Sequence, residues 1–246
     1  MGHITSIKPF STLQMDIFYL MKYYKQNHGY KYILCVVDVF TRMSFCLPMK
    51  TKEIAEVYDS IEELLKIINS NVYKITTDNA ATFLSHEVQK LLKKHDIYHD
   101  VVPVNDHRSL GIIDRFARTL KTILHKSFIK NKNTVWSDIL EKVIKNYNNT
   151  PNSGVLDLKP IDCTKGENIH MLLEYNLLKR KVETTLKNEF EIGNYVRIKK
   201  TGYDKKREGI YSNEIYVVEY IDGKRILLNN QKWYVYDMLI KVKKKR

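Results

Sequence analysis

Cysteine, proline and glycine are scarce, with 3, 5 and 9 of them among 246 residues. So little glycine and proline excludes collagen-like or linker-type sequence. Cys35, Cys46 and Cys163 form neither a C-x-x-C pair nor an even-numbered framework, which predicts reduced, buried, intracellular thiols and no cysteine-rich zinc finger. Long apolar runs are missing too, since none approaches the roughly 18 residues of a membrane span, so we expect no membrane partner.

Acidic residues are outnumbered, because 28 Asp and Glu face 41 Lys and Arg, a net charge of +13. The excess is uneven. Residues 179–246 carry 18 basic and 9 acidic side chains, a net +9, whereas residues 1–178 carry 23 and 19, a net +4. A moderately basic body with a strongly basic tail domain fits a polyanionic partner, with nucleic acid the leading candidate. A Lys-rich surface that only maintains solubility is the alternative.

The hydrophobic pattern predicts an α/β fold class for the first part of the chain. Three strands in a meander, followed by alternating helices and strands, are typical of a central sheet covered on both faces. The expected strands are 12–20, 30–38, 43–49, 72–77 and 97–102; the expected helices are 53–69 capped by Thr51, 86–95 capped by Ser85, 110–130, and one starting at Thr134.

The remainder of the chain changes character twice. Residues 156–188 are irregular and then helical and charged, so we interpret them as a helical connector after a core over residues 1–155. Residues 189–240 contain short alternating strands divided by Gly, Asn and Asp, which predicts a small β-barrel or open sheet. The basic tail KVKKKR, residues 241–246, follows.

Three aspartates occupy unusual positions. Asp16 lies inside an apolar strand, where a charged group is costly. Asp78 follows a strand at the edge where open α/β sheets bind ligands, and Asp114 is in the first turn of a helix. An aspartate of this kind more often forms a turn or caps a helix, which is our interpretation of Asp38.

If the strands that carry Asp16 and Asp78 are neighbours, the two carboxylates lie side by side and the helix of Asp114 supplies a third. Clustered carboxylates repel one another unless cations neutralise them, and hard divalent metals prefer oxygen ligands. Two Mg²⁺ roughly 3.5–4 Å apart can activate the attacking oxygen and stabilise the leaving oxygen of a phosphodiester.

Five segments, in order and in register, resemble the catalytic core of retroviral-type integrases, with the closest likeness to those of Maverick/Polinton-type transposons and related viruses. The segments are LQMDIFYL, YILCVVDVFTRMSFCLPMKTK, ITTDNAATF, HRSLGIIDRFARTLK and WSDILEKVIKNYNNTPNSGVLDLKP. The resemblance implies an RNase H-like mixed five-stranded sheet flanked by helices. It also implies a polynucleotidyl transferase whose catalytic carboxylates, here Asp16, Asp78 and Asp114, hold two Mg²⁺ or Mn²⁺. The terminal β module resembles the SH3-like C-terminal domain of integrases.

Two features depart from that family. The third carboxylate is normally Glu, and Asp114 is shorter by one C–C bond, about 1.5 Å, so its helix must approach the metals more closely. The N-terminal His/His/Cys/Cys zinc module of the family has no room before Asp16. These departures keep an inactive, domesticated descendant as an alternative.

Candidate DNA-binding residues surround the predicted site. Arg118 and Lys121 follow Asp114 by four and seven positions on one helix face, so they are placed to contact the DNA backbone, or else form a solvated face. Asn79 is a candidate to orient the site or to form an Asx turn. The resemblance places further contacts in the loop with Asn105, Asp106 and His107. In the β module the candidates are Lys199, Lys200, Lys205, Lys206 and Arg207.

The sequence therefore predicts a DNA integrase or transposase that trims 3′ ends with water and joins them to target DNA. A catalytically inactive DNA-binding or assembly protein and a plain metal-dependent nuclease are the alternatives. Expected partners are donor and target DNA and further copies of the chain, at least as a dimer, with no small-molecule cofactor. The expected location is the nucleus, or a virion or viral factory.

Overall fold

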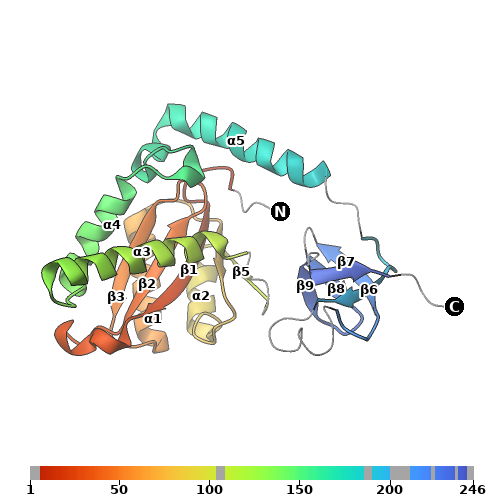
Figure 1. Ribbon diagram of the computed structural model, residues 1–246, viewed down its shortest axis with the longest axis horizontal. Coiled ribbons are helices and arrows are strands. Elements are labelled where there is room, and N and C mark those ends of the chain that lie inside the picture. The colour runs from red at the N-terminus through yellow and green to blue at the C-terminus, as the bar shows by residue number, and fades with distance from the viewer. Residues whose placement is uncertain are drawn as a thin grey trace. The chain divides into compact units, whose positions relative to one another are not determined.

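The computed structural model describes residues 6–103, 109–185, 190–199, 211–222, 225–235 and 238–242. The chain divides into two compact units, one over Ile4–Leu178 and one over Lys179–Arg246 with Met1–His3 (Figure 1). The first unit thus continues past residue 155, where we expected the core to end. The reason is a small apolar cluster, in which Cys163 and Leu172 pack against Phe40 and Val155.

The first unit is built on the predicted mixed five-stranded sheet, with strand order β3-β2-β1-β4-β5. Its first three strands are antiparallel neighbours, and β4 and β5 run parallel to β1. The strands are β1 (Thr12–Tyr19), β2 (Tyr32–Asp38), β3 (Ser44–Met49), β4 (Lys74–Thr77) and β5 (Tyr98–Val101).

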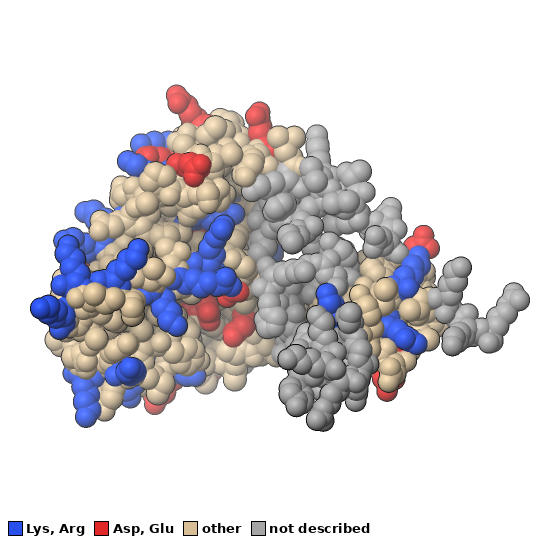
Figure 2. All heavy atoms as spheres, in the orientation of Figure 1, with Lys and Arg blue, Asp and Glu red and all other residues tan. Residues whose placement is uncertain are grey.

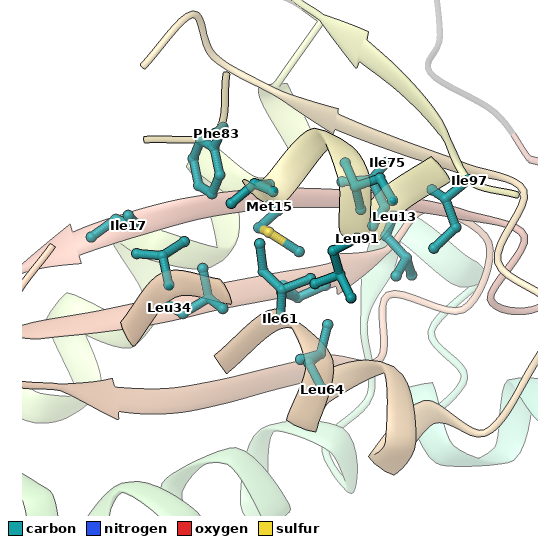
Figure 3. Packing of buried hydrophobic residues seen from close by; sticks show 14 of the residues in the cluster. Leu13, Met15, Ile17, Leu34, Ile61, Leu64, Ile75, Phe83, Leu91 and Ile97 are labelled. Carbon is teal, nitrogen blue, oxygen red and sulfur yellow. The ribbon is translucent and has the colours of Figure 1, made fainter. Parts of the chain in front are cut away.

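Helices cover both faces of this sheet because successive residues of β1 point to opposite sides. Leu13, Met15 and Ile17 pack with α1 (Ile54–Ile68) and α2 (His86–Lys94), and Figure 3 shows this core around Ile61, Leu64 and Leu91. On the other face, Ile33, Cys35 and Val37 of β2 pack with α3 (Gly111–Asn131), α4 (Leu140–Asn148) and Trp136. In Figure 1, α3 lies across the front of the strands.

Helix starts account for most differences from the predicted elements. Ser85 caps α2 as predicted, since its hydroxyl accepts a hydrogen bond from the Val88 N–H. Thr51 does not cap α1; the N-cap is Glu53, and the Thr51 hydroxyl instead donates to the Glu56 carboxylate at 2.6 Å. The helix expected from Thr134 begins with a short 3-10 turn at Ser137, because the Trp136 and Ser137 N–H groups donate to the buried Asn27 side chain.

The second unit contains an all-antiparallel five-stranded sheet with strand order β10-β6-β7-β8-β9, consistent with an SH3-like domain. Its core consists of Val196, Val218, Ile226, Leu228 and Leu239. The strands are β6 (Tyr195–Ile198), β7 (Tyr216–Asp222), β8 (Arg225–Leu228), β9 (Trp233–Val235) and β10 (Leu239–Lys241).

The helix α5 (Gly166–Thr185) spans the boundary between the two units, so part of the expected connector is helical and part packs on the core. None of the helices in the described ranges is both long and apolar enough to cross a membrane.

Candidate active site

The pairing of β1 with β4 brings the first two aspartates together. The strands are parallel, with Leu13 opposite Ile75 and Gln14 opposite Thr76. Asp16 follows Gln14 by two residues, and Asp78 follows Thr76 by two residues. The strand adjacency on which the carboxylate prediction depended is therefore present.

Asp16 is half-buried on the sheet face that α3 covers, and its carboxylate accepts a hydrogen bond from the Ile17 N–H at 2.7 Å. Burial raises the pKa of this carboxyl to about 6, with further contributions from the charges of Asp78 and Asp114. The hydrogen bond from Ile17 opposes the shift. The charges of both other carboxylates are therefore within electrostatic range of Asp16.

Asp78 is exposed at the end of β4, where the chain leaves the sheet. Its side chain accepts a hydrogen bond from the Ala80 N–H at 3.1 Å, which is an Asx turn. The Asx turn that we considered for Asn79 is thus formed by Asp78, and Asn79 is an exposed neighbour.

Asp114 lies in the first turn of α3, and Gln14 fixes the start of that helix. The Gln14 side chain is fully buried; its amide donates to the Ser109 carbonyl at 2.7 Å and accepts from the Ile113 N–H at 2.9 Å. Gln14 precedes Asp16 by two positions, so both side chains are on the same face of β1. One strand thus carries the first carboxylate and holds the helix of the third.

A second polar network supports Asp78 from the other side. The Gln89 amide donates to Nδ1 of His99 at 2.7 Å, which leaves the proton of a neutral imidazole on Nε2. That nitrogen lies 2.9 Å from Thr77 Oγ1, and the Thr77 hydroxyl donates to the Asp78 carbonyl at 2.7 Å. Burial lowers the pKa of His99, in keeping with a neutral ring.

Two thiols adjoin Asp16 on the neighbouring strands. Cys35 is opposite Asp16, and Cys46 is opposite Cys35, with 3.6 Å between the two sulfur atoms. The contact with Cys46 and burial hold the pKa of Cys35 well above its usual value, so this thiol stays protonated. All three cysteines are free thiols; Cys35 and Cys163 are buried, as predicted, whereas Cys46 is partly exposed.

The donor types suit a hard divalent cation. Asp16, Asp78 and Asp114 offer carboxylate oxygens, which Mg²⁺ and Mn²⁺ prefer, and a protonated thiol does not compete as a ligand. The negative charges of Asp78 and Asp114 contribute to the raised pKa of Asp16, and a bound cation would neutralise them. Within the described ranges, however, no group of three or more His, Cys, Asp or Glu is already arranged to enclose a metal ion.

Of the predicted DNA contacts, Arg118 and Lys121 are exposed on α3, and Lys199 is exposed after β6. The candidate Asn79 is exposed as well, and the other candidates lie outside the described residues: Asn105, Asp106, His107, Lys200, Lys205, Lys206 and Arg207. Trp233 is exposed against Tyr220, and Tyr234 packs on the core of the second unit, as expected for successive residues of a strand.

Sequence reasoning missed Gln14, Thr77 and His99 as supporting residues. For Gln14 a signal existed, because a second polar residue stands two positions before Asp16 in an apolar strand and so shares its buried face. For His99 no local signal existed, since its partners come from α2 and β4.

The order β3-β2-β1-β4-β5, with helices on both faces, is that of an RNase H-like fold, as predicted. Residues 7–107 match the family described as the integrase core domain. The first unit is therefore similar to the cores of retroviral-type integrases, in the sequence of residues 7–107 and in its fold.

Two proteins of Caenorhabditis elegans are similar to this chain in sequence. A transposon-derived protein of Caenorhabditis elegans is 27% identical over 201 residues, which cover 80% of this chain and 66% of that protein. An uncharacterised protein of the same organism is 28% identical over 177 residues, covering 68% of this chain and 14% of its own length. The chain therefore spans less than two thirds of either relative.

A solved structure extends the fold comparison to the whole chain. It is the simian T-cell lymphotropic virus intasome in complex with PP2A regulatory subunit B56 gamma. A chain in it matches with a TM-score of 0.75 and 16% identity, over 100% of this chain and 83% of that one.

Proposed function

We propose that this protein is a DNA integrase or transposase that catalyses metal-dependent 3′-end processing and strand transfer. The observation that carries the proposal is the half-buried carboxylate of Asp16, whose charged form is disfavoured by burial and, to a lesser extent, by the charges of Asp78 and Asp114. A cluster of uncompensated carboxylates costs stability, and it is typical of a site that binds divalent cations. The integrase core match supports the reaction class.

In this proposal Asp16, Asp78 and Asp114 hold two Mg²⁺ or Mn²⁺. Bound divalent cations supply Lewis acidity for the attacking and leaving oxygens of a phosphodiester. Gln14 orients the helix of Asp114, and the network of His99 and Thr77 orients the backbone of Asp78. Water first displaces a 3′-hydroxyl from a donor phosphodiester, and that hydroxyl then displaces a 3′-oxygen from the target strand.

Arg118 and Lys121 would contact the DNA backbone beside the carboxylates, because they follow Asp114 on the same face of α3 and are exposed. Donor DNA, target DNA and further copies of the chain remain the proposed partners. An assembly that joins two DNA ends to a target requires more than one copy, and we propose at least a dimer.

The test is a strand-transfer assay on the purified chain with Mg²⁺ or Mn²⁺, compared with Asp78→Asn. Metal-dependent joining that is lost in the variant supports the proposal. Cleavage without joining identifies a nuclease instead. DNA binding without cleavage in both proteins identifies an assembly or DNA-binding protein.

The third carboxylate has a separate test. Asp114→Glu restores the residue usual in the family, whereas Asp114→Asn removes the charge at almost constant volume. If Asp114 is a metal ligand, Asp114→Asn abolishes activity and Asp114→Glu retains it. Equal activity of the wild type and Asp114→Asn would exclude the role of Asp114.

A further inference from the structure

A basic and aromatic surface lies at the end of the core sheet where β1 leads into the 3-10 helix η1 (Met21–Gln26) and β3 ends. We call it the Lys–Tyr surface. Its lysines are Lys22, Lys25, Lys31, Lys50 and Lys52. Figure 2 shows Lys and Arg side chains gathered over the left-hand end of the core unit, where Figure 1 places this segment and the end of α3.

Four of these five lysines make cation–π contacts with tyrosine rings. Lys52 Nζ lies 4.9 Å from the centre of the Tyr19 ring and donates to the Tyr19 hydroxyl at 3.1 Å. Tyr19 in turn packs edge-on against Tyr32. The other contacts are Lys31 over Tyr24 at 5.5 Å, Lys50 over Tyr30 at 5.5 Å and Lys22 over Tyr23 at 5.8 Å.

Carboxylates do not neutralise this surface. Residues 17–37 contain no Asp or Glu. Among the ion pairs of the described residues, none involves these five lysines. Of the acids next to the surface, Glu56 accepts from the backbone N–H of Lys50 and Thr51 and partly offsets the charge of Lys50, Asp138 pairs with His28, and Glu53 follows Lys52 without an ion pair to it among the described residues. The positive charge is therefore available to a ligand.

The segment is held in place by a buried side chain. Asn27 is completely buried; its amide donates to the carbonyls of Tyr23 and Thr134, and its oxygen accepts from the N–H groups of Trp136 and Ser137. A fully satisfied buried amide fixes the backbone that carries the lysines. The backbone that carries Lys22, Lys25 and Lys31 is thus fixed before any ligand binds, which lowers the entropic cost of binding.

We propose that the Lys–Tyr surface binds the phosphate backbone of duplex DNA, independently of the carboxylates. Lysine ammonium and tyrosine hydroxyl groups are common donors to phosphate oxygens. The lysine ammonium groups lie over the faces of the tyrosine rings, where an unpaired base would otherwise stack. Contact with the phosphate backbone of DNA is therefore favoured over stacking of unpaired bases. Tyr19 follows Asp16 by three residues on β1, about 10 Å along the strand, and points to the opposite face of the sheet, so this surface is separate from the carboxylates.

The test compares two double variants of the full chain. Lys31→Gln with Lys52→Gln removes two charges from the Lys–Tyr surface, and Lys90→Gln with Lys93→Gln removes two exposed charges from α2 as the matched control. Binding to a duplex is measured by fluorescence anisotropy in EDTA at several salt concentrations. Each lost phosphate contact lowers the slope of log K against log[salt] by about 0.9, so the first variant loses up to about 1.8 in slope.

We expect the Lys31/Lys52 variant to bind roughly tenfold more weakly near 0.1 M salt, while the control binds like the wild type. Equal effects of the two variants would overturn the proposal. Urea unfolding of both variants excludes loss of fold as the cause. Because binding is measured in EDTA, without divalent metals, failure of strand transfer leaves this result unaffected.

Lysine footprinting provides an independent readout. Acetylation with and without duplex DNA, read by mass spectrometry, should show protection of Lys22, Lys31 and Lys52 relative to Lys90 and Lys93. Unchanged reactivity of the surface lysines would contradict the proposal. Binding to polyglutamate or to phosphatidylserine vesicles should be weaker than binding to DNA. Tighter binding to either of them that depends on Lys31 and Lys52 would also contradict the proposal, because it would assign the surface to an acidic protein or a membrane.

Discussion

Gln14 and Ile113 are joined by a hydrogen bond of 2.9 Å although 99 positions separate them in the sequence. The bond caps the first turn of α3 from within β1, a role that a local Ser or Asp usually performs. The helix itself has no side-chain cap of its own at Leu110. The buried amide of Gln14 and the apolar packing of α3 on β2 together fix the position of Asp114 relative to Asp16.

Replacing Gln14 with Ala should destabilise the protein by about 2 kcal/mol or more, because the Ser109 carbonyl and the Ile113 N–H lose their partner. Urea unfolding measures this loss. Mn²⁺ affinity, measured by calorimetry under conditions where the variant is folded, should also fall, since the helix of Asp114 loses its anchor. Unchanged Mn²⁺ affinity would mean that Gln14 is structural only.

Gln26→Ala is the matched control for that experiment. The Gln26 amide also bridges distant segments, donating to Thr134 at 2.6 Å, but the bond is exposed to solvent. Water replaces an exposed hydrogen bond, so we expect a loss below about 0.5 kcal/mol. A loss equal to that of Gln14→Ala would show that burial is not the cause.

Asp16→Asn should stabilise the metal-free protein at neutral pH. The pKa of Asp16 rises from an ordinary 3.8 to about 6 on folding, so the unfolded chain loses this proton first as pH increases. The folded state therefore loses relative stability between about pH 4 and 6. At 1.36 kcal/mol per pKa unit, the full cost at pH 7.5 is up to about 3 kcal/mol.

Urea unfolding in EDTA at pH 7.5 and pH 4 checks this prediction. The variant should be more stable than the wild type at pH 7.5, with little difference at pH 4, where the folded carboxyl is protonated and the unfolded one is only about half ionised. Asp78→Asn should give a smaller gain, because the charge of Asp78 is a lesser contribution than burial. A gain of equal size at both pH values would contradict the assigned cause.

Much of the core could be predicted because its signals are local. The apolar strand around Cys35 and the helical spacing of Val57, Ile61 and Leu64 specify their elements directly. The chain order of strands and helices then gives the layer architecture, and the position of Asp78 after a strand gives the edge of the site.

The features that sequence reasoning misplaced depend on tertiary contacts. The helix predicted from Thr134 starts later because Asn27, far away in the chain, binds the backbone at Trp136 and Ser137. The core extends beyond residue 155 because Leu172 finds an apolar partner in Phe40. Neither contact leaves a pattern in the local sequence.

Thr77→Val should lower both the affinity for Mn²⁺ and the stability of the fold. Thr77 is buried, and its hydroxyl links His99 to the Asp78 carbonyl. Valine keeps the shape but removes the hydroxyl, leaving His99 Nε2 without its partner and costing about 1–3 kcal/mol. Thr77→Ser retains the hydroxyl and is the control. Mn²⁺ titration should rank the affinities as wild type, then Thr77→Ser, then Thr77→Val; equal affinities would exclude a role in orienting Asp78.

Deleting residues 189–246 should lower DNA affinity while the core remains folded. The deleted segment carries 14 basic and 8 acidic residues, a net charge of +6, and its five strands belong to a separate compact unit. The truncated chain keeps the buried clusters of the first unit, so its urea unfolding transition should match that of the core in the full chain. Anisotropy with duplex DNA should show weaker binding and a shallower salt dependence, because fewer phosphates are neutralised. Unchanged affinity would place all of the DNA contacts on the core, with the Lys–Tyr surface and α3 as the remaining candidates.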